Sequence, residues 1–79
     1  MDAARVERAN STLQPLLERA RSALSASPIY ELRSLRVEAH NGGLVISGLV
    51  QSFYYKQLAQ ELVRSVARDT NVTNSIDVS

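Results

Sequence analysis

The spacing of hydrophobic positions changes along the chain, and each change marks a new element. A helical spacing of three and four residues comes first, and it predicts an amphipathic helix through Leu13, Leu16, Leu17, Ala20 and Leu24. Ser11 or Thr12 is a suitable N-cap, with Pro15 in or next to the first turn, where its missing N–H costs little. The sequence Ser25-Ala26-Ser27-Pro28 ends the helix, because proline prevents its continuation.

A period of two follows, which is typical of a half-buried strand. Its inward side holds Leu35, Val37 and Ala39, which alternate with polar residues. The Asn41-Gly42-Gly43 sequence supplies the positive φ angles of a tight hairpin turn, so residues 44–50 return as an antiparallel strand. Gly48 inside that strand indicates either a bulge or the close approach of a packed helix.

A second amphipathic helix is predicted next, followed by a third strand. Ser52 is its N-cap, and the segment 69–71 closes it with Asn71 in the left-handed conformation. Its apolar face consists of Tyr55, Leu58, Ala59, Leu62, Val63 and Val66. Residues 72–78 alternate again, with Asn74 on the inward side. The expected fold is α+β, in the order α-β-β-α-β, with both helices on one face of a three-stranded mixed sheet.

Composition and size limit the classes of function. Seventy-nine residues suffice for one small domain, predicted over residues 11–79, after a frayed or partly helical tail over residues 1–10. A net charge of +1, with charges interspersed, gives no nucleic-acid footprint. The apolar runs are too short for a transmembrane segment, and the charged N-terminal residues do not form a signal peptide. As written, the chain is expected in the cytoplasm or peripheral to a membrane, and in the periplasm or envelope only as part of a longer chain.

No enzyme, metal or cofactor chemistry is expected. His40 is the only histidine, and the chain has no cysteine to join it as a metal ligand. Glu38 and Asp77 are the carboxylates that an acid/base pair would need across the open sheet face, but both are expected to face water beside Arg36. No serine has a nucleophile motif or a histidine partner.

Several short motifs of the chain are informative in combination. They are Ser27-Pro28-Ile29-Tyr30, Leu35-Arg36-Val37, Asn41-Gly42-Gly43, Leu44-Val45-Ile46-Ser47-Gly48 with Val50, Lys56-Gln57-Leu58-Ala59, and Val72-Thr73-Asn74-Ser75-Ile76-Asp77-Val78. Together these motifs resemble a BON domain. The likeness covers roughly residues 20–78, with Asn71 where the family usually has glycine. It implies a non-catalytic bacterial module that binds phospholipid or acts in protein interactions.

Two surfaces are candidates for binding. The first faces an anionic phospholipid surface or a partner and consists of Phe53, Tyr54, Lys56, Arg64 and Arg68. On this first surface, Phe53 is either an exposed anchor or a cap that folds back over the strand-helix junction. The second is the open face of the sheet, which would serve a protein partner or a homo-oligomer, and consists of Arg36, Val45, Leu49 and Asp77. The sequence leaves the ligand, the partner and the oligomeric state undetermined.

Overall fold

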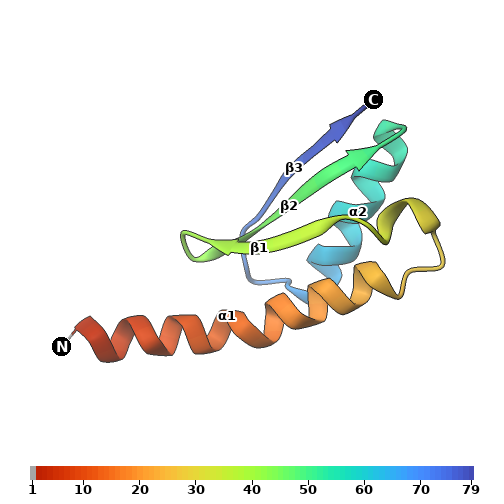
Figure 1. Cartoon of the computed structure of the whole chain (residues 1–79). Coiled ribbons are helices and arrows are strands. Elements are labelled where there is room, and N and C mark those ends of the chain that lie inside the picture. The colour runs from red at the N-terminus through yellow and green to blue at the C-terminus, as the bar shows by residue number, and fades with distance from the viewer. Residues whose placement is uncertain (1) are drawn as a thin grey trace.

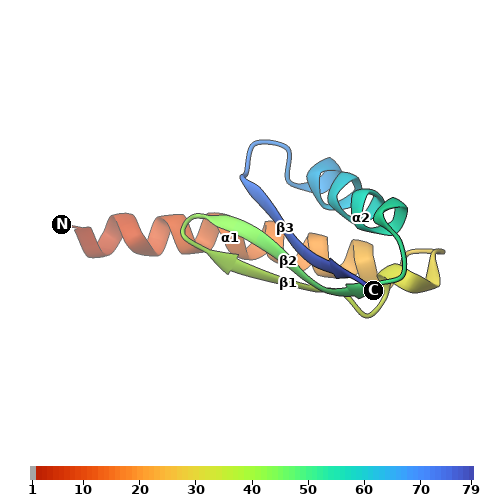
Figure 2. The same cartoon turned by 90° about the horizontal axis from the view of Figure 1, so that it is seen from above.

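A computed structural model describes residues 2–79, with side chains from Leu13 onward. The elements, in chain order, are α1 (Asp2–Ser25), the 3-10 helix η1 (Tyr30–Leu32), β1 (Arg36–His40), β2 (Gly43–Val50), α2 (Phe53–Val66) and β3 (Val72–Val78). The strands lie in the order β1-β2-β3, with β1 antiparallel and β3 parallel to β2. Both helices lie on the same side of the sheet (Figures 1 and 2). The predicted α+β fold is therefore confirmed.

The helix α1 begins earlier than predicted. It runs from Asp2 through Pro15, so the expected start at Ser11 or Thr12 was wrong, whereas the expected end at Ser25 is confirmed. Pro15 lies within this helix and is exposed. The division into a tail over residues 1–10 and a domain over residues 11–79 stays a prediction.

The hairpin between β1 and β2 follows the expected turn chemistry. Asn41 has a φ of 51° and Gly42 a φ of 79°, as a two-residue turn with positive φ at both positions requires. His40 pairs with Gly43 across this turn. Ala39 lies on the inward side as predicted, since it pairs with the buried Leu44, but it is exposed. It lies next to the turn on an edge strand.

The core lies between the sheet and the two helices. Its buried apolar residues are Leu17, Ala20, Leu24, Leu32, Leu35, Val37, Leu44, Ile46, Val50, Ala59, Val63, Ala67 and Ile76. The small side chains of Ala20 and Ala59 are completely buried, which allows each helix to pack closely against its neighbours. Because α2 contributes Ala59 and Val63 to this core, its opposite side is left for the solvent.

The start of α2 agrees with the prediction, but its end does not. Ser52 is the N-cap, and its Oγ accepts a hydrogen bond from the Tyr55 N–H at 3.4 Å. The helix ends at Val66, and Asn71 has no positive φ, so the predicted left-handed closure at Asn71 was wrong. The chain turns earlier because Ala67 is buried and its carbonyl accepts the Thr70 N–H at 3.2 Å. The Asn71 carbonyl instead accepts the Leu44 N–H at 2.8 Å, which aligns β3 with β2.

Gly48 marks a close approach, but not of a helix. Its φ is +134°, and a Cβ added there would lie 2.7 Å from Cδ2 of Leu35. Leu35 belongs to the segment between η1 and β1, so this segment and β2 meet where Gly48 has no side chain. Of the two alternatives for Gly48, the close approach is therefore correct, and the partner differs from the one expected.

Candidate functional site

The outer side of α2 carries exposed aromatic side chains at its first turn. Phe53 is 74% exposed and Tyr54 is 68% exposed. Of the two alternatives for Phe53, the structure has the exposed one. The cause is local, since the Ser52 cap fixes the first turn and Tyr55, not Phe53, then packs against the core.

The structure brings three of the five predicted α2 residues together. Phe53, Lys56 and Arg64 line one open groove of about 380 Å³, whose other walls are Gln57, Gln60, Glu61 and Asn74. Arg68 lies outside this groove and lines a neighbouring depression that also includes Arg64. Tyr54 does not line either of them, and its ring lies 5.7 Å from the ring of Tyr55 at an angle of 57°.

Asn74 holds this groove in place. Its Nδ2 donates to the Lys56 carbonyl at 2.9 Å and to Oε1 of Gln60 at 3.0 Å, which ties β3 to α2. Its Oδ1 accepts the Ile76 N–H at 3.2 Å, on the edge of the sheet. Sequence reasoning placed Asn74 on the inward side of the strand without assigning it a role. A polar residue at an inward strand position was the signal that pointed to such hydrogen bonds.

The open face of the sheet brings the second candidate set into one surface. Leu49 is 61% exposed and pairs with Asp77, whereas Val45 is half-buried. Arg36 pairs with Ser47, between the positions of Val45 and Leu49 on β2. This surface therefore consists of isolated apolar side chains among charged and hydroxyl groups.

The two carboxylates of this face do not meet. Glu38 is opposite Val45 and Asp77 is opposite Leu49, so four residues of β2, about 13 Å, separate the two rows. Both side chains are exposed, as expected. The partner of Glu38 is Arg21 of α1, and not the neighbouring Arg36.

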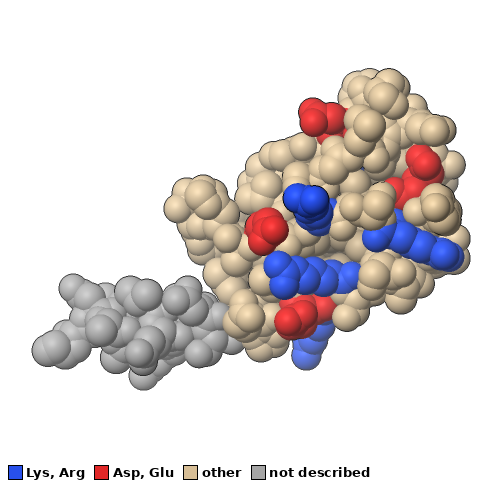
Figure 3. Space-filling view, viewed as in Figure 1, with Lys and Arg blue, Asp and Glu red and all other residues tan. Residues whose placement is uncertain are grey.

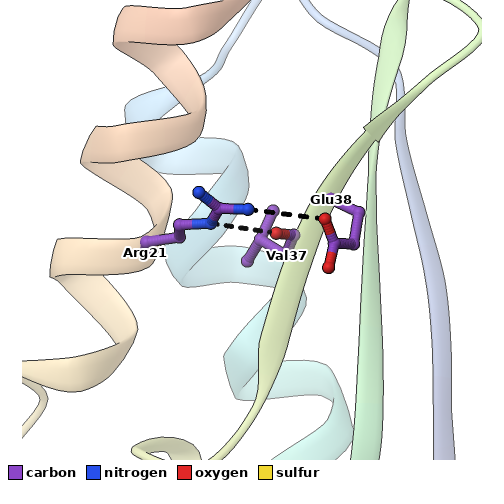
Figure 4. Close-up of polar contacts among 3 residues, drawn as sticks. All are labelled: Arg21, Val37 and Glu38. Carbon is purple, nitrogen blue, oxygen red and sulfur yellow. Dashed lines mark hydrogen bonds and ion pairs between the residues drawn. The ribbon is translucent and has the colours of Figure 1, made fainter.

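Arg21 reaches from α1 to the free edge of β1 (Figure 4). Its Nε donates to the Val37 carbonyl at 3.2 Å, and its Nη2 donates to Oε2 of Glu38 at 3.4 Å. An edge strand presents unpaired backbone groups that can pair with another chain, and a bound arginine covers one of them. We interpret this contact as structural.

Comparison with protein families assigns most of the chain to one family. A protein-family model described as BON domain matches residues 13–79, which is most of the chain. The chain belongs to the BON domain family. No curated protein matched it. The matched residues include the groove, the open sheet face and all three strands, so both candidate surfaces belong to the BON domain itself.

The described surface of this BON domain carries charges of both signs. Basic and acidic side chains are interspersed on the face in Figure 3, and no single sign of charge dominates it. In the part of the chain that the structure describes, no three His, Cys, Asp or Glu residues are grouped to hold a metal ion. Within the same residues, neither α1 nor α2 has the length and hydropathy needed to span a bilayer. His40 is exposed beside the hairpin turn.

Proposed function

We propose that this BON domain binds the surface of phospholipid membranes without catalysing a reaction, through the outer side of α2. The observation that carries the proposal is the exposed ring of Phe53 in the same groove as Lys56 and Arg64. Aromatic rings partition into the interfacial zone of a bilayer, and basic groups are attracted to anionic head groups. Tyr54 and Arg68 extend this surface at the two ends of the helix.

The expected affinity is low and depends on salt. Each basic residue near an anionic surface contributes about 1 kcal/mol, so Lys56, Arg64 and Arg68 together contribute about 3 kcal/mol. Glu61 lines the same groove and reduces this attraction. The helix binds in its folded position, because Ala59 is completely buried and leaving the sheet would expose the core.

Vesicle co-flotation tests this proposal. Vesicles of phosphatidylcholine alone are compared with vesicles that also contain phosphatidylserine, at low and high salt. We expect flotation only with the anionic lipid at low salt, and weaker flotation of the Phe53→Ser and Arg64→Ala variants. Arg36→Ala is the matched control, since it removes an exposed arginine from the open sheet face. Absence of flotation, or an equal loss with Arg36→Ala, would contradict the proposal.

A second candidate function is protein interaction or self-association through the open sheet face. The exposed Leu49, beside the half-buried Val45, favours it. The measurement is molecular mass by light scattering over a dilution series. Self-association that disappears in the Leu49→Lys and Val45→Lys variants, with unchanged circular dichroism, would support this function. A monomer at every concentration would exclude self-association.

A further inference from the structure

The most exposed large apolar side chains lie at one end of the molecule. Among the described side chains they are Tyr30 at 80%, Leu49 at 61%, Phe53 at 74% and Tyr54 at 68%. They come from η1, β2 and α2, and these three segments meet at the end of the molecule opposite the hairpin turn (Figures 1 and 2). We name these four residues the aromatic pole.

The topology explains why the elements that carry these four residues come together at one end. The strand β2 ends at Val50 and α2 begins at Phe53, so Leu49 is close to the start of the helix. Leu35 lies against Gly48, which brings the segment that follows η1 to the end of β2. In addition, η1 contacts α2. The strand β1 begins at Arg36, opposite Ser47 of β2, so Leu49 has no partner residue on β1.

Charges at the aromatic pole balance, so electrostatic attraction is not its main property. The Arg33 guanidinium carbon lies 5.8 Å from the centre of the Tyr30 ring, and Lys56 follows Tyr54 after one residue. Glu31 is adjacent to Tyr30, and Asp77 is paired with Leu49. This end therefore adds a mainly apolar contact to the electrostatic attraction that the basic residues of the α2 surface provide, and its tyrosine hydroxyl groups remain accessible to water.

The chemistry of this end favours a bilayer as the partner. A stable protein interface buries about 800 Å² on each partner in a well-packed patch. The aromatic pole instead consists of four side chains from three separate elements. The interfacial zone of a bilayer accommodates separate side chains. Tyr is enriched in that zone, and Phe and Leu are side chains that interfacial helices bury in it.

We propose that the aromatic pole penetrates the interfacial zone of phospholipid bilayers, with Tyr30 and Leu49 entering beside Phe53 and Tyr54. This inference rests on the proposed membrane binding and adds an orientation to it. The hairpin turn then stays in water, and α2 is inclined to the membrane. Arg64 follows Phe53 by eleven residues, about 16 Å along the helix, so it reaches only head groups and Arg68 lies further out.

Single tryptophans report this orientation, because the chain has no tryptophan of its own. The full chain is prepared with Tyr30→Trp, Leu49→Trp or Phe53→Trp, and with His40→Trp as the control at an exposed position beside the hairpin turn, away from the aromatic pole. Each variant is mixed with vesicles of phosphatidylcholine and phosphatidylserine, with or without brominated acyl chains. We expect a blue shift and bromine quenching at the three pole positions and neither at position 40.

The outcomes separate this inference from the proposed function. If the wild type does not float with the vesicles, both are wrong. If it floats but Tyr30→Trp and Leu49→Trp keep the emission of water-exposed tryptophan, membrane binding stands and the orientation is wrong. A shift at His40→Trp instead would mean that the hairpin end enters the membrane, and the orientation would again be wrong.

A second variant tests the contribution of η1 to affinity. Tyr30→Ser is expected to weaken vesicle partitioning about tenfold, the loss for part of one buried aromatic side chain. Tyr30→Phe is expected to preserve most of the partitioning, because the ring remains. The Tyr30 side chain is 80% exposed, so both variants should keep the wild-type circular dichroism spectrum. Equal partitioning of Tyr30→Ser and wild type would overturn the inference.

Discussion

Replacing Gly48 with alanine tests how closely β2 fits against the segment before β1. The residue has a φ of +134°, which side-chain-bearing residues rarely adopt. An added Cβ would lie 2.7 Å from Cδ2 of Leu35 and 3.5 Å from its Cα. Leu35 is itself buried, so its side chain has little room to move away. Gly48→Ala therefore imposes both backbone strain and a steric clash.

The expected loss of stability is large for a domain of this size. An unfavourable φ costs about 1–3 kcal/mol, and overpacking a core costs about 1–3 kcal/mol, so the sum is about 2–6 kcal/mol. A chain of 79 residues typically has about 4–12 kcal/mol of unfolding free energy. Gly42→Ala is the matched control. Gly42 has a φ of +79° with nothing within 4 Å of an added Cβ, so only the backbone cost of about 1 kcal/mol remains.

Urea unfolding followed by circular dichroism measures these differences. With a slope of about 1 kcal/mol per molar urea, a loss of 3 kcal/mol lowers the midpoint by about 3 M. Leu35→Ala in the Gly48→Ala background separates the cost of the steric clash from the cost of the backbone strain at position 48. This double variant should lose less stability than the two single variants added together, because the clash is removed. If Gly48→Ala is no less stable than Gly42→Ala, or if the cycle is additive, the argument for a clash is refuted.

Two further predictions concern hydrogen bonds between elements. Asn74→Ala should lower the unfolding free energy by about 1–3 kcal/mol, because the Lys56 carbonyl and the Ile76 N–H lose their side-chain partner. Gln57→Ala, at an exposed position of the same groove, should change it by less than about 0.5 kcal/mol in the same urea assay. Arg21→Ala should lower the unfolding free energy by at most about 1 kcal/mol, since its ion pair with Glu38 is exposed. The same variant should increase aggregation of the native protein, measured by light scattering, because it uncovers the edge of β1. An unchanged aggregation rate would mean that the arginine does not protect this edge.

Much of the fold was predictable because local signals agreed with one another. The Asn41-Gly42 turn, the period of two around it and the Ser52 cap each specify a conformation over a few residues. The start of α1 and the path after α2 were not predictable in this way. Pro15 and Asn71 are local signals for a break and a left-handed turn, and the structure has neither at those positions.

The candidate site was predictable only where one helix determines it. The helical angle of Phe53 placed it away from the apolar face but left open whether it folds back as a cap, and the structure has the exposed alternative. Tyr30 was not identified, because its position depends on the connection between α1 and β1. That connection is fixed by contacts of the buried Ser27, whose Oγ accepts the Ile29 N–H at 3.1 Å and whose carbonyl accepts Nε of Arg33 at 2.8 Å. Such contacts become visible only in three dimensions.

The mixed sheet also sets an order of folding. The β1–β2 pairs are separated by 3 to 11 residues, from His40 with Gly43 to Arg36 with Ser47, so this hairpin can form within about 1–10 μs. Every β2–β3 pair, such as Leu44 with Val72, is separated by 28 residues, and its loop-closure entropy is correspondingly larger. Until β3 docks, the backbone N–H and C=O groups on that side of β2 are unpaired, so a second unfolded chain can pair there during folding.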